Sequence, residues 1–279
     1  MTKQIPNFNV QKILLLLALA ASVAGAVFVT QSVLDIDREM AKAEEAARPV
    51  KVSIVKITAP NCADCFNVEA SVGALKSQHV FVSDERAVPF DSDEGKRLIA
   101  AHGITQVPTY IATGEVKSEK IAAFVAGNGE VRGDVFVFTK VQPVFIDTAS
   151  GEEKGRIELV FLTDKSCKDC YDTDAHRQIL VNRFGTKLRT ERKVDMAEAE
   201  GRALVQKYAI TKVPTVLLSP EAGAYAALQI IWGQVGTVQE DGWYVFREVS
   251  QMGGVYKDLS TNKIVRPAAA TSVSTETAN

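Results

Sequence analysis

"TAPNCADCF" (58–66) and "TDKSCKDCY" (163–171) are two similar stretches that together hold all four cysteines of the 279-residue chain. In each stretch the two cysteines stand three positions apart, directly after a run rich in β-forming residues, "VSIVKIT" (52–58) or "IELVFLT" (157–163). Cysteine pairs of this kind serve as metal ligands, as structural disulfides or as redox-active sites. The sequence around them bears on which of the three applies.

The surroundings of the two pairs are repeated along the chain. "LIAAHGITQVPTYIA" (98–112) resembles "LVQKYAITKVPTVLL" (204–218), and the first cysteines are 167 − 62 = 105 residues apart, the prolines 214 − 108 = 106. Matched blocks at matched offsets indicate a duplicated unit, and two copies are too few for a solenoid. We therefore expect two like domains in tandem, joined at the polar stretch "TASGEEKG" (148–155).

Each unit has the same predicted order of elements. A strand leads into the CxxC motif, and a helix is expected directly after the motif, over 66–78 in the first copy and 171–185 in the second. Then follow a strand, a second helix, a strand that opens at the proline, and a hairpin over 122–138 or 228–246. This order predicts an α/β fold in which a mixed sheet is flanked by helices.

A CxxC motif at a strand-to-helix junction has a chemical consequence. It places the first cysteine at the helix N-terminus, where free N–H groups and the helix dipole favour the thiolate. The second cysteine then lies close enough to attack a mixed disulfide. Asn61 and Ser166 precede the first cysteines and are candidate helix caps. We expect Cys62 and Cys167 to be the exposed thiols, and Cys167, beside Lys168, to react faster.

With the CxxC motifs and the "GITQVPT" and "AITKVPT" segments in place, the chain resembles the thioredoxin superfamily over residues 50–146 and 155–265. The resemblance implies two tandem thioredoxin-like domains that exchange thiols and disulfides with protein substrates or a redox partner. The implied site residues are the nucleophiles Cys62 and Cys167, the resolving thiols Cys65 and Cys170, and the cis-proline loops Val107-Pro108 and Val213-Pro214, which shape the substrate groove. It implies no cofactor.

The chain also departs from the family pattern. No tryptophan precedes either motif, and Lys56 and Phe161 stand where thioredoxins proper keep a buried acid. Two alternatives therefore stay open. The pairs are structural disulfides in a non-catalytic binding or assembly module, or they are thiolate ligands of zinc, although the 167 − 65 = 102 residues between the pairs are far from finger spacing.

The N-terminus predicts a membrane anchor. No charged residue occurs over 13–34, a length that spans about 33 Å as a helix, close to one hydrocarbon core. Lys3 and Lys12 precede this stretch and acidic residues follow it, which predicts an extracytoplasmic body. The alternative is a signal peptide cleaved near 24–26, which would give a secreted protein. Disulfides can persist in either location.

Composition limits the remaining function classes. An apolar content of 46% and a charged content of 24% are those of a globular protein, and a net charge of −2 gives no basic surplus for nucleic acid. The predicted segments are a cytoplasmic N-terminus (1–12), a transmembrane anchor (13–34), a helical stalk (35–49), two thioredoxin-like domains (50–150 and 151–266) and a disordered tail (267–279).

Overall fold

The computed structural model describes Ser22 and residues 35–267 of the chain. Among these residues, no helix has both the length and the apolar character needed to cross a membrane. The predicted cytoplasmic segment (1–12), the predicted anchor (13–34) apart from Ser22, and the predicted tail after Pro267 lie outside the described residues.

The chain divides into two units, Met1–Val50 and Lys51–Asn279. In the first unit, residues 35–47 are helical and exposed, within the span where the sequence predicts a stalk. Ion pairs between residues three apart, Arg38 with Asp35 and Arg48 with Glu45, lie along it, as expected for a solvated helix of mixed charge.

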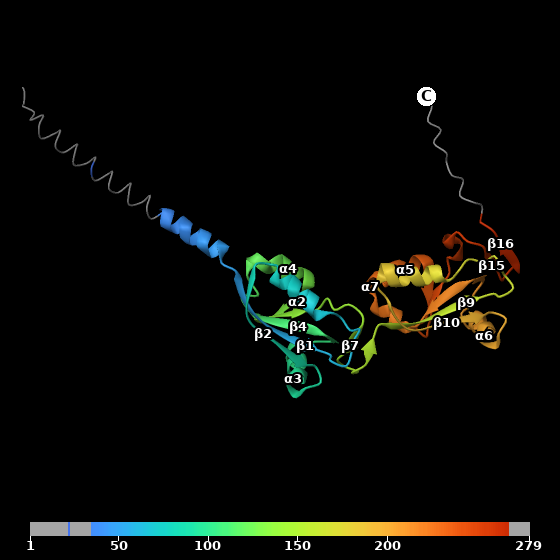
Figure 1. The fold of residues 1–279 in the computed structure, drawn as a ribbon, viewed down its shortest axis with the longest axis horizontal. Coiled ribbons are helices and arrows are strands. Elements are labelled where there is room, and N and C mark those ends of the chain that lie inside the picture. Colours follow the sequence, from blue (N-terminus) through green and yellow to red (C-terminus); the bar gives the residue numbers. More distant parts are fainter. Residues whose placement is uncertain (1–21, 23–34, 268–279) are drawn as a thin grey trace, which may run out of the picture. The chain divides into compact units, whose positions relative to one another are not determined.

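Residues 50–138 contain a five-stranded sheet in the order β2-β1-β4-β6-β5, of which β1, β2 and β4 are labelled in Figure 1. Its strands are β1 (Val50–Thr58), β2 (Val80–Pro89), β4 (Thr109–Gly114), β5 (Gly129–Arg132) and β6 (Val135–Phe138). The accompanying helices are α2 (Val68–Lys76), α3 (Asp93–His102), α4 (Ala122–Asn128) and the 3₁₀ turn η1 (Glu119–Ile121). β1 and β4 run antiparallel in the middle of the sheet, with Ile54 opposite Ala112.

A second five-stranded sheet follows in the order β10-β9-β12-β14-β13. Its strands are β9 (Arg156–Thr163), β10 (Lys187–Asp195), β12 (Thr215–Leu218), β13 (Gly236–Val238) and β14 (Tyr244–Phe246). Its helices are α5 (Asp174–Phe184), α6 (Ala199–Lys207), α7 (Ala226–Val235) and the 3₁₀ turns η2 (Pro220–Ala224) and η3 (Val249–Met252). The class is therefore mixed α/β with two helix-flanked sheets, as the sequence predicts, and corresponding strands hold the same places in both sheets.

Two small three-stranded sheets, which the sequence analysis missed, lie beside the large ones. They are β3-β7-β8 and β11-β15-β16. Their strands are β3 (Gln106–Val107), β7 (Phe145–Asp147), β8 (Glu153–Lys154), β11 (Lys212–Val213), β15 (Tyr256–Asp258) and β16 (Lys263–Val265). In both, the short strand that precedes the V-P-T proline pairs antiparallel with the chain segment that follows the large sheet.

The predicted hairpins are partly helical. α4 and α7 occupy the first halves of the segments 122–138 and 228–246, and only the second halves pair as strands. The β-branched and aromatic composition favoured strand, but the buried side chains of α7, Leu228 and Trp232, stand four residues apart, which is the helical period. Tertiary packing of that face outweighs local β propensity.

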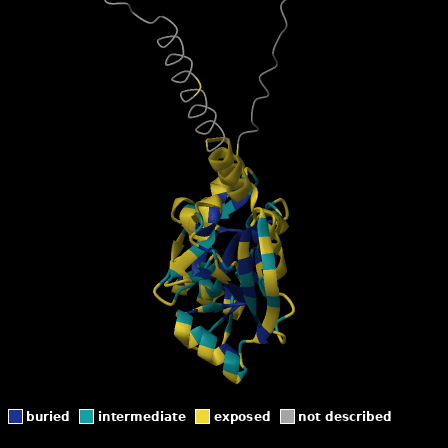
Figure 2. Cartoon of the chain, turned by 90° about the vertical axis from the view of Figure 1, so that its left-hand side faces the viewer, coloured by how far each residue is buried: buried dark blue, intermediate teal, exposed yellow. Residues whose placement is uncertain are grey.

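The cores lie between sheets and helices, where Figure 2 shows the buried residues gathered and the outer faces exposed. β9 is buried on both faces: Ile157 and Phe161 pack with Leu228 and Trp232, while Leu162 packs on the opposite face. Its nearly continuous apolar sequence is typical of a central strand covered on two sides. A separate cluster beneath the first CxxC motif includes Ile57, Ala59 and Ile146, with Cys62 and Cys65 packed against it.

Candidate functional site

Each CxxC motif forms its own disulfide. Cys62 is bonded to Cys65 and Cys167 to Cys170, and no cysteine of the chain is free. All four sulfurs are therefore engaged, so the structure holds no thiolate set of the kind that binds zinc.

The first disulfide lies in a turn and not in a helix. The Cys62 N–H donates to the Ala59 carbonyl and the Cys65 N–H to that of Cys62. α2 begins only at Val68, with the Asn67 side chain accepting hydrogen bonds from the N–H groups of residues 69 and 70. The helix predicted over 66–78 is therefore present, but the prediction that Cys62 lies at its N-terminus with Asn61 as the cap is wrong, because Asn67 caps it.

The second disulfide repeats this arrangement. The Cys167 N–H donates to the Asp164 carbonyl, and α5 begins only at Asp174. Ser166 does not cap that helix, because its hydroxyl donates to the Asp164 side chain at 2.6 Å. Free helix N–H groups thus do not surround either first cysteine, and the helix-dipole argument for their reactivity does not hold here.

The exposure of the cysteines differs from the expectation at one position. Cys167 is buried, with 7% of its surface exposed, whereas Cys62, Cys65 and Cys170 are half-buried. The prediction that Cys167 is the exposed thiol of its pair is wrong, because Cys167 is buried and Cys170 is the more accessible of the two.

Both V-P-T segments contain a cis peptide bond. Both the Val107-Pro108 and the Val213-Pro214 peptide bonds are cis, which confirms the prediction. Pro214 lines an open pocket of about 250 Å³ together with Cys167, Cys170 and Asp164.

The threonines of the two V-P-T segments have matching roles. Thr109 and Thr215 are fully buried, and their hydroxyls donate to the carbonyls of Phe138 and Phe246 at 2.6 and 2.7 Å. These bonds tie each proline segment to a neighbouring strand of its large sheet. Buried hydroxyls need such partners, which explains why the same residue stands at both positions.

The segments after each large sheet, for which the sequence suggested no role, hold the two halves of each site together. The Val144 carbonyl accepts from the N–H of Phe66, directly after the first CxxC motif, and the Val255 carbonyl accepts from Tyr171, directly after the second. The strands that follow, β7 and β15, pair with β3 and β11, so that Val107 lies opposite Ile146 and Val213 opposite Lys257. One segment thus contacts both the disulfide loop and the proline strand.

Charged side chains lie around the first disulfide: Glu153 on β8, Arg156 at the start of β9, and Asp64 inside the CxxC motif. The Glu153 carboxylate lies 3.4 Å from the Cys62 sulfur. A disulfide sulfur carries no hydrogen, so this is a contact in the oxidised protein and becomes a hydrogen bond only when a thiol forms. Arg156 binds both Glu153 and Asp64, the aspartate inside the CxxC motif.

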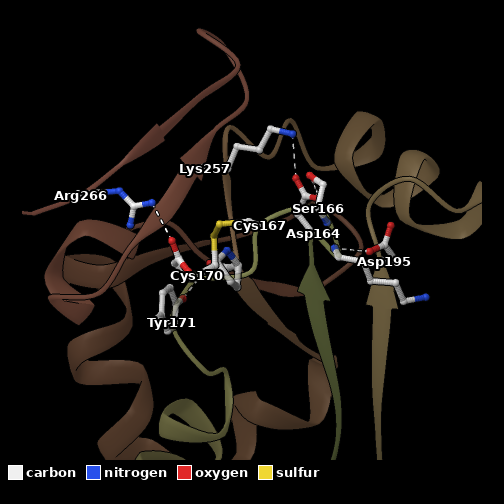
Figure 3. The surroundings of a disulfide bond; sticks show 11 residues. Asp164, Ser166, Cys167, Cys170, Tyr171, Asp195, Lys257 and Arg266 are labelled. Atoms are coloured by element: carbon white, nitrogen blue, oxygen red, sulfur yellow. Dashed lines mark hydrogen bonds and ion pairs between the residues drawn. A yellow bond between two sulfur atoms is a disulfide. The ribbon is translucent and has the colours of Figure 1, made fainter.

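The second disulfide has an ion pair that the first lacks. On β15, Lys257 binds the buried Asp164 carboxylate at 2.8 Å (Figure 3). Burial by itself raises the pKa of Asp164, but the hydrogen bonds from Lys257 and Ser166 outweigh it and hold that pKa below its ordinary value. In the first site the corresponding positions are the apolar Ala59 and Ile146.

A polar network supports the second proline loop. The Tyr171 hydroxyl donates to the Pro214 carbonyl at 2.8 Å and lies 2.8 Å from His176 Nε2. Since the hydroxyl has one hydrogen, His176 donates to Tyr171 through Nε2–H. Burial lowers the pKa of His176 to about 4, so this histidine is neutral at pH 7. The first site has instead an apolar stack of Phe66 on Phe138.

Comparisons with known proteins add little. No family model and no curated protein matches the chain. Among solved structures, "Crystal structure of ERdj5 form I" matches 66% of this chain and 28% of its own at 10% identity and a TM-score of 0.19. The N-terminal domain of alkylhydroperoxide reductase AhpF from Enterococcus faecalis matches 66% of this chain and 89% of its own at 14% identity and a TM-score of 0.20. Human ERp44 matches 62% and 45% at 10% identity and a TM-score of 0.17.

Likenesses with TM-scores near 0.2 carry no argument about this chain. The chain also spans less than a third of the ERdj5 structure that it matches. The case for a function therefore rests on the chain's own motifs, geometry and charges.

Proposed function

We propose that the chain is a membrane-anchored, extracytoplasmic thiol–disulfide oxidoreductase built from two thioredoxin-like domains (50–150 and 151–266). One observation carries the proposal: beside each five-stranded sheet, the segment that follows the sheet contacts both the CxxC disulfide loop and the V-P-T proline strand. A purely structural staple does not require the proline segment to be held at the disulfide, whereas a substrate groove does.

The proposed chemistry is thiol–disulfide exchange. A thiolate of a protein substrate attacks one sulfur of a CxxC disulfide, a mixed disulfide forms, and the bond's electron pair leaves on the partner cysteine, which takes a proton from solvent. We assign the mixed disulfide to Cys62 and Cys167 and the resolving role to Cys65 and Cys170. Val107-Pro108 and Val213-Pro214 border the groove that the substrate enters. Protein thiols or a redox partner are the proposed substrates, and no cofactor is needed.

The anchor and the location are also proposals. They rest on the uncharged stretch 13–34 and on the lysines before it and acids after it. Protease treatment of intact cells or spheroplasts tests them: the body is expected to be digested from outside, and digestion only after the membrane is broken would overturn the location.

Trapping tests the chemical proposal. In full-length protein, Cys65→Ser and Cys170→Ser are expected to accumulate mixed disulfides with a peptide that carries one thiol, after activation of the remaining cysteine with a thiol-exchange reagent. Cys62→Ser and Cys167→Ser serve as matched variants. Equal accumulation from all four variants would overturn the assigned roles, and accumulation from none would overturn the proposed function.

The rival function is a non-catalytic binding or assembly module with two structural disulfides. The observation in its favour is the burial of Cys167, which limits direct attack on that sulfur. This hypothesis predicts that both disulfides resist thiol reductants for as long as the protein stays folded.

A further inference from the structure

The same ion pair occurs at both CxxC motifs. Arg156 binds Asp64 at 2.8 Å, and Arg266, which is labelled in Figure 3, binds Asp169 at 2.7 Å. Asp64 and Asp169 occupy the same position inside their motifs, directly before the second cysteine. The arginines come from similar but not identical places: Arg156 is the first residue of β9 and is separated from the end of β8 by Gly155, and Arg266 directly follows β16.

The two strands of each small hairpin are held to different degrees. The inner strands, β7 and β15, are fixed by pairing to the proline strands and by the bonds from Phe66 and Tyr171. The outer strands, β8 and β16, have those inner strands as their strand partners, and β8 is also tied to Glu221 by Lys154 and by the N–H of Gly155. Each arginine–aspartate pair thus joins the residues just beyond an outer strand to the disulfide loop.

The outer strand of the first hairpin lies against the disulfide. Glu153 on β8 is 3.4 Å from the Cys62 sulfur, and Arg156 holds Glu153 as well as Asp64. Exchange needs the incoming sulfur to reach a disulfide sulfur, so it depends on access. A small thiol occupies little room beside β8, whereas a folded protein brings a surface that meets this strand.

We propose that Arg156 and Arg266 are latches that determine which thiols react. With the ion pair closed, the outer strand stays on the CxxC loop and the disulfide is open to small thiols. A protein thiol must displace that strand before its sulfur makes contact. This inference rests on the proposed function, since it concerns the substrates of the same exchange reaction.

The expected effect is modest because these pairs reach solvent. The Arg156 side chain is 23% exposed and that of Asp64 52%, while the Arg266 and Asp169 side chains are 59% and 62% exposed. Ion pairs at such sites contribute at most about 1 kcal/mol, which corresponds to about a five-fold change in rate. The larger effect is expected at the first site, where Arg156 is less exposed and holds two carboxylates.

The test measures reduction of one disulfide at a time in full-length protein whose other pair is replaced by serine. Two reductants are compared: dithiothreitol as the small thiol, and a reduced folded dithiol protein, thioredoxin. Arg156→Gln and Arg266→Gln are expected to raise the ratio of the protein-driven rate to the dithiothreitol rate about two- to five-fold, and Arg266→Gln, which leaves Glu153 neutralised by Arg156, to leave the dithiothreitol rate itself unchanged. Lys117→Gln, which removes the exposed pair with Asp134 away from both motifs, is the matched control.

A charge swap separates the latch from a general loosening of the fold. Asp169→Arg alone is expected to speed reduction by the protein, and Asp169→Arg combined with Arg266→Asp to restore the wild-type rate. Salt near 1 M is expected to raise the rate at which the protein dithiol reduces wild type toward the rate of the variants, because salt screens exposed ion pairs.

The outcomes distinguish the latch from the underlying function. Equal protein-driven rates in wild type and variants, or an equal gain with dithiothreitol, would overturn the latch and leave the exchange reaction standing. Reduction by dithiothreitol alone, with no reaction with the protein dithiol in wild type or any variant, would overturn the proposed function itself.

Discussion

Replacing Glu153 by glutamine is expected to make the reduced Cys62 a better nucleophile. The carboxylate lies 3.4 Å from the Cys62 sulfur. In the reduced protein it disfavours the thiolate in two ways, by like-charge repulsion and by accepting a hydrogen bond from the neutral thiol. Glutamine keeps the shape of the side chain and removes the charge. The thiolate should therefore form at lower pH in the variant.

The distance sets the size of the effect. Two unit charges 3.4 Å apart interact with about 1.2 kcal/mol in a medium like bulk water and about 5 kcal/mol at an effective dielectric constant of about 20. Arg156 neutralises much of the Glu153 charge, so the lower figure applies. Since 1.36 kcal/mol corresponds to one pH unit, the midpoint of the reaction profile should fall by about one unit.

The assay is alkylation of Cys62 by iodoacetamide against pH, followed by mass spectrometry. Full-length protein with the other three cysteines replaced by serine makes Cys62 the single thiol. Glu152→Gln is the matched control, because Glu152 stands next to Glu153 but binds Lys154 at 2.7 Å. A midpoint that is unchanged in Glu153→Gln, or that falls equally in Glu152→Gln, would refute the reasoning.

Three further predictions concern the second site. Lys257→Met leaves the buried Asp164 carboxylate without its cationic partner and should lower the free energy of unfolding in urea at pH 7 by about 3 kcal/mol. Because the folded pKa of Asp164 is below its ordinary value, the pair's stabilisation is present above about pH 4 and is lost as the pH falls through the folded pKa. An unchanged stability at pH 7 would contradict the pair's role. The pKa of His176 is about 4 in the folded protein, below the ordinary 6.5, so the unfolded chain binds a proton more readily. The free energy of unfolding of wild type should therefore fall by about 3 kcal/mol between pH 6.5 and 4, and His176→Gln should not show that fall. The same dependence of stability on pH in both proteins would contradict this prediction. Tyr171→Phe removes the bond to Pro214 and should cost about 1–3 kcal/mol, measured by the same unfolding transition, whereas a neutral result would show that the network contributes nothing.

Sequence patterns anticipated the parts of the fold that local chemistry determines. The β runs before each CxxC motif, the V-P-T prolines and the repeat offset predicted the central strands, the cis bonds and two similar sheets. These features depend on residue types that stand close together in the chain. The helices predicted over 66–78 and 171–185 are present as α2 and α5, but the first cysteines do not lie at their N-termini, because Asn67 caps α2 and residues 66 and 171 are held outside the helices by bonds to distant carbonyls.

The features missed from the sequence are long-range contacts. Glu153 meets Cys62 across 91 residues, Lys257 meets Asp164 across 93, and Arg266 meets Asp169 across 97. No local period encodes such pairs. A signal was nevertheless present in the segments 144–152 and 255–262, which extend each repeat beyond its large sheet and carry charged residues in a β-rich setting. The strand register determines which residues of these segments pair: Ile146 is opposite Glu153 in the first hairpin, and Lys257 is opposite Ile264 in the second.

The reduction potential of each disulfide tests the central claim most directly. Each pair is equilibrated with thiol buffers of known potential in full-length protein whose other pair is serine, and the reduced fraction is counted by alkylation and mass spectrometry. The account predicts that both pairs titrate reversibly above about −300 mV while the protein stays folded, because structural disulfides of secreted proteins lie below that value. Pairs that stay oxidised down to that potential, and reduce only when the protein unfolds, would contradict it.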